Sequence, residues 1–326
     1  MEENNNHSPI TLDNAVIKTD KKFFDAAKKV IRKEGFVSFI KKSWSAFYHT
    51  VRRFVREYIP LKYHYKHSKG GQVVRQVQDS FMFLDLRDTG ISRELTLYGV
   101  HEKNSTAAIK RILKPGMKIL ECGANIGYYA MLEARLVGPN GKIYAVEPSP
   151  KNIAWLKRNI AIESYENIEV IPGAFGAEKG VAPFYVDIRS NLSSFVKRDD
   201  LTEFEVVDVE MMNIDSFMET PEHDVDLIRM DVEGYETEIL KGGEKTLMSG
   251  RAPKYFFIEV HSELLKKRGS GGWEIAKYLR QFGYEVDIGF HRGSSRYVVT
   301  SMKEFEEHPM REVGYWEIFF RLDRQK

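Results

Sequence analysis

Four titratable residues stand at the ends of two apolar runs. Asp231 and Glu233 follow the run LIRM, and Glu259 and His261 end the run FFIEVH. If both runs are strands of one parallel sheet, their carboxyl ends open on the same crevice, and strand alternation places Glu259 and His261 on one face. A carboxylate and an imidazole placed in this way can remove a proton from a reacting group. We therefore predict that His261 is a general base oriented by Glu259, while Asp231 and Glu233 shape the pocket around the transferred group.

The same four side chains allow other interpretations. A divalent cation bound by all four would lower the pKa of an alcohol without a protein base, but we favour a site without metal. Alternatively, Asp231 or Glu233 caps a helix that begins near Tyr235, where acidic side chains are favourable. His261 is alternatively a structural histidine whose hydrogen bonds are satisfied within the fold.

A second candidate site lies in the segment ILECGANIGYY, which joins an apolar run to a helical pattern. Gly123 and Gly127 have no side chains, so a ligand can approach the backbone at the end of the first strand. Asn125 and Tyr128 stand where a dinucleotide-binding G-x-G-x-x-G motif has its second and third glycines, which argues against NAD. Glu121 precedes the turn, and a carboxylate there suits an ammonium and a sulfonium better than a phosphate. These charges favour S-adenosylmethionine as the cofactor.

The next apolar run, KIYAVE, ends in Glu147, 24 residues after Gly123. A carboxylate at the end of the second strand can accept hydrogen bonds from both hydroxyls of a ribose. After the third strand, Gly173, Ala174 and Phe175 are placed to flank the adenine, and Phe175 is alternatively a core residue. The predicted cofactor-binding residues are Glu121, Gly123, Asn125, Gly127, Tyr128, Glu147, Pro148, Ala174, Phe175 and Asp231.

Short apolar runs alternate with helical patterns from about residue 113 onward, which is typical of βαβ units in a mainly parallel sheet. The expected strands are 117–122, 142–147, 168–171, 226–231 and 255–261, with 284–288 and 315–321 as a later antiparallel pair. The expected helices are 126–136, 150–163, 235–248 and 272–282. The predicted fold class is α/β and Rossmann-like, with a mainly parallel seven-stranded sheet and helices on both faces.

A resemblance to a known family rests on four ordered motifs between about residues 92 and 261. They are RELTLYGVHE, ILECGANIGYYAMLEARLVGPNGKIYAVEPSPKNIAWLKRNI, DLIRMDVEGYETEILKGGEKTL and FIEVH. In these motifs the chain resembles the FkbM family of methyltransferases. The resemblance implies a Rossmann-like class I methyltransferase fold, S-adenosylmethionine as cofactor, and O-methylation of a hydroxyl on a sugar, polyketide or other small molecule. Glu121-Cys122 departs from the Asp and small or β-branched residue that the family more often has here.

The first 90 residues lie outside this resemblance. Residues 1–20 are rich in Asn and acids and are predicted to be a disordered tail. Residues 21–66 contain 13 Lys/Arg and 3 Asp/Glu, a charge of +10 in a chain whose net charge is +2. Apolar residues recur at three- and four-residue intervals over 36–58, which predicts a basic amphipathic helix ended by Pro60. The expected domains are the tail, a basic helical extension over 21–90, and the Rossmann-like methyltransferase domain over 91–326.

The basic helix has two interpretations. Either it packs on the catalytic domain with a solvated basic face, or residues 36–59 contact a membrane surface or another anionic partner. A rival function is therefore a protein without catalysis that binds a membrane surface or another anionic partner through this helix. The intact set Glu121, Gly123, Gly127 and Glu147 argues against it. Nucleic acid is not expected as the substrate, because the rest of the chain carries a charge of −8 (+2 minus +10), which opposes phosphate binding.

The sequence also indicates in which compartment we expect the protein. The start MEENNNHSPI is polar and acidic, and no run of about 18 apolar residues occurs, so we expect neither an export signal nor a spanning helix. One cysteine, Cys122, excludes an internal disulfide and a multi-thiolate metal site. We expect a cytoplasmic protein, peripheral at the inner membrane face if the helix binds lipid. The expected acceptor is a hydroxyl of a small molecule, a sugar or a lipid-linked glycan; no oligomeric state is predicted.

Overall fold

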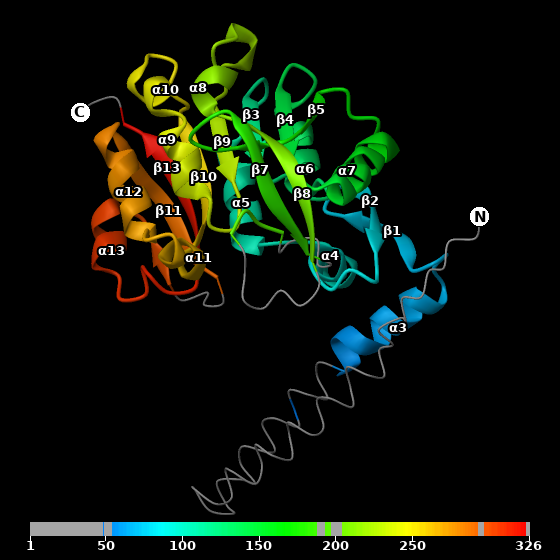
Figure 1. Ribbon diagram of the computed structural model, residues 1–326. Helices are drawn as coiled ribbons and strands as arrows, with labels where there is room; N and C mark the ends of the chain where they lie inside the picture. Colours follow the sequence, from blue (N-terminus) through cyan, green and yellow to red (C-terminus); the bar gives the residue numbers. More distant parts are fainter. Residues whose placement is uncertain (1–47, 49–53, 188–192, 197–203, 293–296, 324–326) are drawn as a thin grey trace, which may run out of the picture. The chain divides into compact units, whose positions relative to one another are not determined.

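The computed structural model describes residues 48, 54–187, 193–196, 204–292 and 297–323. The chain divides into two compact units, Met1–Lys66 and His67–Lys326 (Figure 1). The predicted tail over 1–20 and most of the predicted amphipathic helix over 36–58 lie outside the described residues. Membrane contact through residues 36–59 therefore stays a prediction.

In the first unit, the described residues form a π-helical turn, η1 (Phe54–Tyr58), followed directly by helix α3 (Ile59–Lys66). The prediction that Pro60 ends the helix is wrong. Pro60 is the second residue of α3, in the first turn, where the missing N–H and the fixed φ of proline are tolerated. Among the described residues, no helix has the length and apolar character needed to cross a bilayer.

The second unit begins with a β-hairpin where we had expected helix. Strands β1 (Gln72–Val77) and β2 (Ser80–Asp85) pair antiparallel, from Gln72 opposite Asp85 to Val77 opposite Ser80. A two-residue connection joins them, and its first residue, Gln78, has a positive φ of 53°, as tight hairpin turns require. The helical extension predicted over 21–90 is thus wrong for 72–85, and this unit starts at His67 rather than at residue 91.

An eight-stranded sheet forms the centre of the second unit (Figure 1), in the order β12-β11-β13-β10-β9-β3-β4-β5. Five strands run parallel: β3 (Lys118–Cys122), β4 (Lys142–Glu147), β5 (Ile168–Pro172), β9 (Leu227–Met230) and β10 (Tyr255–His261). Three pair antiparallel: β11 (Tyr284–His291), β12 (Val298–Val299) and β13 (Tyr315–Leu322). All seven predicted strands are present, and the two-residue edge strand β12 is additional.

Helices cover both faces of this sheet, as predicted. One face packs against α4 (Ile91–Tyr98), α5 (Lys103–Ile112), α6 (Tyr128–Val137), α7 (Pro150–Glu163) and the hairpin. The other packs against α8 (Ile214–Phe217), α9 (Glu236–Lys241), α10 (Glu244–Met248), α11 (Ser262–Lys267), α12 (Gly272–Gln281) and α13 (Met302–Glu307); a 3-10 turn, η2 (Pro221–His223), follows α8. The sheet divides the hydrophobic core in two, because successive residues of a strand face opposite sides. Ile119 packs on the side of α4 to α7, and Leu120 packs on the side of α8 to α13. The single helix expected over 235–248 is broken into α9 and α10 at Gly242-Gly243.

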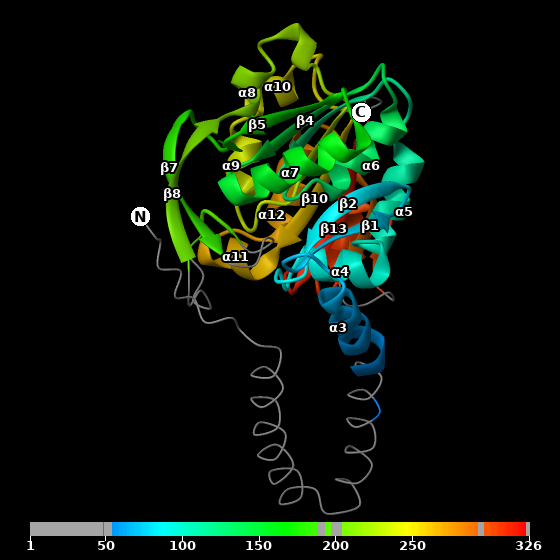
Figure 2. The same cartoon turned by 90° about the vertical axis from the view of Figure 1, so that its right-hand side faces the viewer.

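A small three-stranded sheet was not predicted. It consists of β6 (Ala174–Phe175), β7 (Gly180–Asp187) and β8 (Phe204–Met212), in the order β6-β8-β7. Figure 2 shows β7 and β8 beside the central sheet, where they form a flap of their own. Residues 193–196 pair with this flap, because Ser194 and Tyr185 exchange two backbone hydrogen bonds of 3.0 Å. The flap reaches the carboxyl ends of the parallel strands, where the candidate site lies.

Candidate functional site

The turn after β3 brings two glycines into positions that exclude a side chain. Gly123 has a φ of +88°, and a Cβ there would lie 2.1 Å from the backbone oxygen of Asp231. Gly127 has a φ of +96°, and its Cβ would lie 2.6 Å from Leu156 of α7. We had attributed both glycines to clearance for a ligand. The structure adds a second reason, because the missing side chains allow the backbone of Asp231 and helix α7 to approach the turn closely.

Glu147, at the end of β4, is held by hydrogen bonds on both carboxylate oxygens. The Asn125 N–H donates to Oε2 at 2.8 Å, and the Ser149 N–H and the Asn152 amide donate to Oε1 at 2.9 and 3.3 Å. Burial raises the pKa of Glu147 to about 7, although these hydrogen bonds act in the opposite direction. The Asn125 contact also joins the glycine turn to the end of β4.

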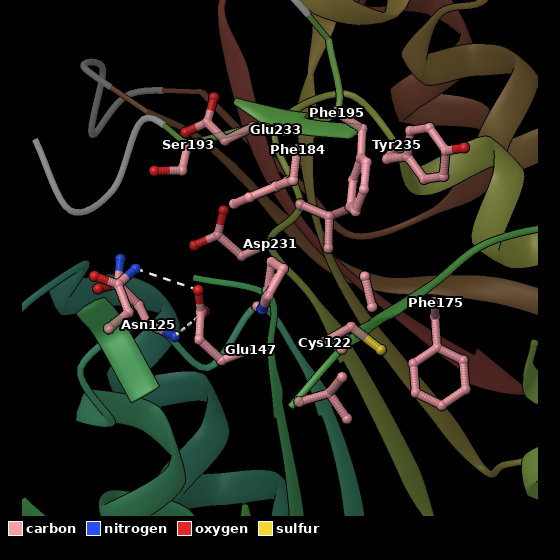
Figure 3. Close-up of a pocket in the computed structure, with 17 residues that line it drawn as sticks. Cys122, Asn125, Glu147, Phe175, Phe184, Ser193, Phe195, Asp231, Glu233 and Tyr235 are labelled. Carbon is pink, nitrogen blue, oxygen red and sulfur yellow. Dashed lines mark hydrogen bonds between the residues drawn. The ribbon is translucent and has the colours of Figure 1, made fainter. Parts of the chain in front are cut away.

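A pocket of about 610 Å³, part of it open to solvent, lies above these strand ends (Figure 3). Its predicted members are Gly123, Asn125, Glu147, Pro148, Ala174, Phe175, Asp231 and Glu233. Gly173, which was predicted to flank the adenine, also lines it. Its other lining residues were not predicted to bind: Cys122, Val146, Asn152, Phe184, Ser193, Phe195, Val232 and Tyr235.

Three aromatic rings from different elements close one side of this first pocket. Phe184 lies on β7, Phe195 lies between β7 and β8, and Tyr235 precedes α9. The ring centroids of Phe184 and Phe195 are 4.8 Å apart, and those of Phe195 and Tyr235 are 5.0 Å apart. Only the unpredicted flap brings these rings together, so no signal in the local sequence indicated them.

A second pocket adjoins the first and shares Gly123, Asn125, Asp231 and Glu233 with it. Predicted residues Glu121, Tyr128 and Glu259 line this second pocket, whereas Gly127 lines neither. Its unpredicted lining residues are Ile91, His101, Ala124, Tyr129, Arg229 and Arg292. Asp231 and Glu233 therefore line both of these adjoining cavities.

The side chain of Glu121 is paired inside the protein. It accepts a hydrogen bond of 2.7 Å from Arg229, a buried residue of β9 whose guanidinium lies 3.8 Å from the ring centroid of Tyr129. Arg229 also lies 3.4 Å from Asp231 and 3.8 Å from Glu102. Burial raises the pKa of Glu121, and the charge of Arg229 opposes that shift. The carboxylate that we predicted to face a cofactor ammonium is thus already neutralised by an arginine.

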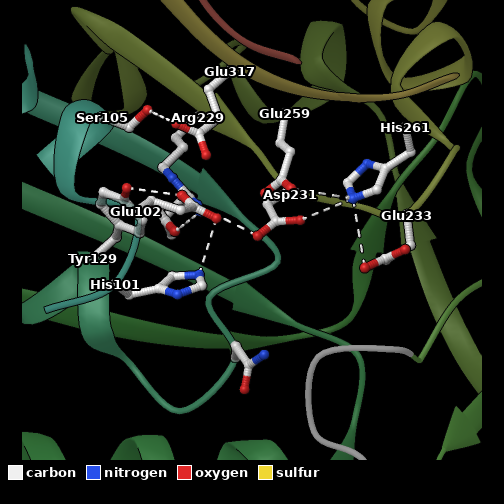
Figure 4. A network of polar contacts seen from close by, with 12 residues as sticks. His101, Glu102, Ser105, Tyr129, Arg229, Asp231, Glu233, Glu259, His261 and Glu317 are labelled. Atoms are coloured by element: carbon white, nitrogen blue, oxygen red, sulfur yellow. Dashed lines mark hydrogen bonds and ion pairs between the residues drawn. The ribbon is translucent and has the colours of Figure 1, made fainter. Parts of the chain in front are cut away.

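His261, at the end of β10, is surrounded by four carboxylates. Figure 4 shows three of them, those of Asp231, Glu233 and Glu259. Its Nδ1 lies 2.8 Å from Glu236, and its Nε2 lies 3.5 Å from Glu233, 3.6 Å from Glu259 and 3.7 Å from Asp231. Glu236, rather than Glu259, therefore orients the imidazole. Glu259 instead accepts a hydrogen bond of 2.5 Å from a second cation, the guanidinium of Arg292.

The carboxylates around His261 shift the pKa of its imidazole. Burial alone would lower the pKa of His261, but the surrounding carboxylates, Glu233 foremost, outweigh it and raise the pKa well above its usual value. The role of general base for His261 stays a prediction.

The alternative that Asp231 or Glu233 caps the following helix is wrong. Helix α9 has Tyr235 at its N-cap position, without a hydrogen bond from a capping side chain. The backbone instead turns sharply, with positive φ at Glu233 (51°) and at Gly234 (92°). A Cβ on Gly234 would lie 2.6 Å from Leu264, so this turn packs closely on α11. The turn leaves Asp231 and Glu233 lining the two pockets.

A further buried group at the second pocket was missed in the sequence. His101 is 5% exposed and lies between two carboxylates, with Nδ1 2.7 Å from Glu94 and Nε2 3.0 Å from Glu102. Burial would lower the pKa of His101, but Glu102 and then Glu94 outweigh this and raise it to about 10. These residues come from α4 and from the turn before α5, outside the alternating strand and helix pattern.

Comparison with known proteins gives one family and several partial similarities. The profile of the methyltransferase FkbM domain matches residues 121–286, just over half of the 326 residues. A protein-L-isoaspartate O-methyltransferase of Methanothrix thermoacetophila is 43% identical over 61 residues, which are 19% of this chain and 29% of that protein. A second such enzyme, from Archaeoglobus fulgidus, is 39% identical over 61 residues, 19% of this chain and 28% of that protein. The chain thus matches less than a third of the length of these relatives.

Solved structures show weaker similarity. Trm5b of Pyrococcus abyssi has a TM-score of 0.41 and 13% identity, covering 78% of this chain and 56% of that one. TYW2 of M. jannaschii, in complex with AdoMet, has a TM-score of 0.40 and 15% identity, covering 78% of this chain and 89% of that one.

Proposed function

Because the chain belongs to the methyltransferase FkbM domain family, we propose that it transfers the methyl group of S-adenosylmethionine to a hydroxyl of a small molecule, a sugar or a lipid-linked glycan. The observation that carries this proposal is the pair of adjoining pockets, which share Gly123, Asn125, Asp231 and Glu233. A methyl donor and its acceptor must meet in one cavity with their reacting atoms aligned. Two adjoining pockets that share polar lining residues can hold the donor and the acceptor side by side.

The first pocket supports binding of the adenosine part of the cofactor. Glu147 lines it as a buried carboxylate, which in its ionised form accepts hydrogen bonds from ribose hydroxyls. Ala174 and Phe175 lie beside it, on β6, and supply the apolar contact that an adenine ring needs. With the adenosine there, the sulfonium lies toward Asp231, and the second pocket remains for the methionine end and the acceptor.

The second pocket favours an uncharged or cationic acceptor over a phosphate. Its carboxylates include Glu121, Asp231, Glu233 and Glu259. Its two arginines are already engaged, since Arg229 pairs with Glu121 and Arg292 pairs with Glu259. Phosphate groups bind where positive charge is in excess, which is not the case here. A hydroxyl acceptor has no charge to be repelled.

The reaction needs alignment and the loss of a proton. In methyl transfer the acceptor oxygen displaces the sulfonium sulfur in line, and holding both groups in place supplies much of the acceleration. The alcohol proton leaves during attack, and the carboxylates at the pocket junction are the groups placed to attract it. Asp231, whose side chain is 26% exposed, is open to both pockets.

Isothermal titration of the purified chain with S-adenosylmethionine tests this proposal. We expect binding, no binding of NAD, and an affinity about ten- to a hundredfold weaker in Glu147→Ala, because hydrogen bonds to a charged group contribute about 1.5–3 kcal/mol. Glu169→Ala is the matched control, since this exposed carboxylate of β5 pairs with Lys142 away from the pockets. Equal weakening in both variants, or no binding to folded protein, would remove the cofactor assignment.

The acceptor class is tested with labelled cofactor. Incubation with a panel of hydroxylated sugars and glycolipids should transfer the labelled methyl group to oxygen, which mass spectrometry of the product locates. Methylation of nitrogen or of a carboxylate instead of a hydroxyl would refute the acceptor class while leaving the cofactor assignment in place.

A further inference from the structure

We propose that Asp231, Glu233 and His261 bind a small divalent cation at the junction of the two pockets, with Glu259 beside it. Each residue offers one ligand atom, and these three atoms lie within 4.8 Å of one another. Glu259 and Asp231 belong to a second such group with Glu102. The proposal rests on the proposed function only for what the cation does, because binding itself depends on these side chains alone.

The distances at His261 suit shared coordination better than direct hydrogen bonding. Nε2 lies 3.5 Å from Glu233 Oε1 and 3.7 Å from Asp231 Oδ1. Direct hydrogen bonds from a nitrogen to an oxygen are about 2.7–3.2 Å long. Ligands of an octahedral cation with bonds of about 2.1 Å lie about 3–4.2 Å apart. Both measured separations fall within that second range.

The other face of the imidazole is fixed as it is in metal centres. Nδ1 lies 2.8 Å from Glu236 Oε1, which also accepts a hydrogen bond of 3.1 Å from the N–H of Gly234. Metal-binding histidines commonly donate their second N–H to a carboxylate, which fixes the tautomer and aims the other nitrogen at the ion. Here the aimed nitrogen, Nε2, points toward Asp231 and Glu233 (Figure 4).

An independent observation comes from Glu259. This residue is 1% exposed, and its carboxylate is directed toward Asp231 and His261 (Figure 4). One oxygen accepts a hydrogen bond from Arg292, whereas Oε2 has no hydrogen-bond partner among the described residues. A buried carboxylate oxygen without a partner is costly. A cation at Asp231 would satisfy it, directly or through a bound water.

The donor set indicates which ion fits. Carboxylate oxygens suit Mg²⁺ and Mn²⁺, and a single imidazole is compatible with Mn²⁺. Because Asp231 and Glu233 line both pockets, such an ion would contact an acceptor hydroxyl and lower its pKa, so the carboxylates would act through the ion.

The test is Mn²⁺ binding to the full chain without cofactor or acceptor, followed by electron paramagnetic resonance. We expect one site that weakens by about a hundredfold or more in His261→Gln and in Asp231→Asn, because loss of outer partners alone costs about 10- to 100-fold. Pulsed spectra of the wild-type complex should show coupling of Mn²⁺ to an imidazole nitrogen, and His261→Gln should abolish it.

Controls keep the outcome unambiguous. Glu263→Gln removes an exposed carboxylate of α11, two residues after His261, and should leave Mn²⁺ affinity unchanged. If Asp231→Asn does not fold, Glu233→Gln replaces it. Unchanged binding in the ligand variants, or bound Mn²⁺ without nitrogen coupling, overturns the site. Mn²⁺ binding is measured without S-adenosylmethionine, so its failure would be distinct from failure of cofactor binding.

Discussion

Arg229 is a buried cation that pairs with three carboxylates behind the site. Its side chain is 2% exposed and reaches Glu121, Asp231 and Glu102 from the middle of β9. Its guanidinium also lies on the ring of Tyr129. Planar, always charged and able to donate in several directions, arginine is the residue best suited to such a place. The position of Asp231 at the pocket junction is therefore tied to Arg229.

We predict that Arg229→Met lowers the free energy of unfolding by about 3–5 kcal/mol, because it leaves the buried carboxylate of Glu121 without its partner. The matched control is Arg251→Met. Arg251 is 40% exposed, pairs with Asp224 at the surface, and should contribute less than about 1 kcal/mol. Urea denaturation of both variants measures the difference; equal losses would show that Arg229 contributes only as a surface ion pair does.

Glu147 makes cofactor binding sensitive to pH. Its pKa in the folded protein is raised to about 7, mainly by burial. Because the ionised carboxylate is the better acceptor for ribose hydroxyls, the Kd for S-adenosylmethionine should fall about tenfold from pH 6 to pH 8, following the ionised fraction. Titration calorimetry at several pH values measures this. The slope should vanish in Glu147→Gln, and a slope that persists there would assign the pH dependence to another group.

The raised pKa of Glu147 also makes the free energy of unfolding depend on pH in a defined direction. A glutamate in the unfolded chain titrates near 4.3. Between that pH and about 7, the folded protein binds more protons at Glu147 than the unfolded chain does. Stability from this group is therefore highest below the unfolded pKa and decreases as the pH rises to about 7.

At the scale of elements, the close approach of β3 and β9 forms the floor of the site. The two strands pair in parallel from Ile119 opposite Leu227 to Cys122 opposite Met230. Directly beyond this register, Gly123 lies under the backbone of Asp231. The turn after β3 thus fixes the position of Asp231, which follows β9.

We predict that Gly123→Ala destabilises the fold far more than Gly116→Ala. Both glycines have positive φ, 88° and 86°, so alanine costs about 1–2 kcal/mol at each. A Cβ at residue 116 meets nothing within 4 Å, whereas at residue 123 it overlaps a backbone oxygen, adding about 1–3 kcal/mol. Chemical denaturation compares the two variants. Equal losses would mean that the contact between the turn and β9 relaxes freely.

The elements show how far prediction from sequence extended. The strand Tyr255–His261 was predicted to the residue, and β9 was predicted within one residue at each end, because buried strands form continuous apolar runs. The hairpin over 72–85 and the flap were missed. Their strands carry exposed residues between half-buried ones, as in β7, so their apolar pattern is weak. Their pairing depends on partners that local pattern does not reveal.

In the candidate site, too, local sequence pattern predicted some residues but not the contacts between distant segments. Residues that end predicted strands, such as Glu147 and Asp231, do line the pockets. Arg229, Glu236 and His101 were missed, because each matters through a contact with a residue distant in the chain. Arg229, for instance, reaches Glu121 across 108 positions of sequence. The close contact between Gly123 and the backbone of Asp231 was also not predicted, because these two residues are distant in the chain.

At the scale of the whole sheet, β13 connects the parallel half to its antiparallel edge. It lies between β10 and β11 and pairs antiparallel with both. Its side chains Trp316, Ile318, Phe319 and Phe320 are completely buried. The ring of Phe319 stacks on Phe257 of β10, with centroids 4.1 Å apart and an interplanar angle of 10°.

We predict that Phe319→Ala lowers the free energy of unfolding by about 3–5 kcal/mol, the usual loss when a buried phenylalanine is truncated. Val298→Ala is the control on the edge strand β12, where the side chain is 43% exposed and the change should be below about 1 kcal/mol. Thermal and urea denaturation measure both. A loss at Phe319 as small as that at Val298 would mean that β13 is not needed to hold the sheet together.

The place of β13 has a consequence for how the protein is made. A ribosome releases β10 and β11 before β13, although β13 is the neighbour that both of them require. Until then, the nascent chain presents two unpaired strand edges and the apolar faces of Phe256 and Phe257. Synthesis rate and chaperone supply should therefore govern the yield of folded protein more than they would in a sheet assembled in strand order.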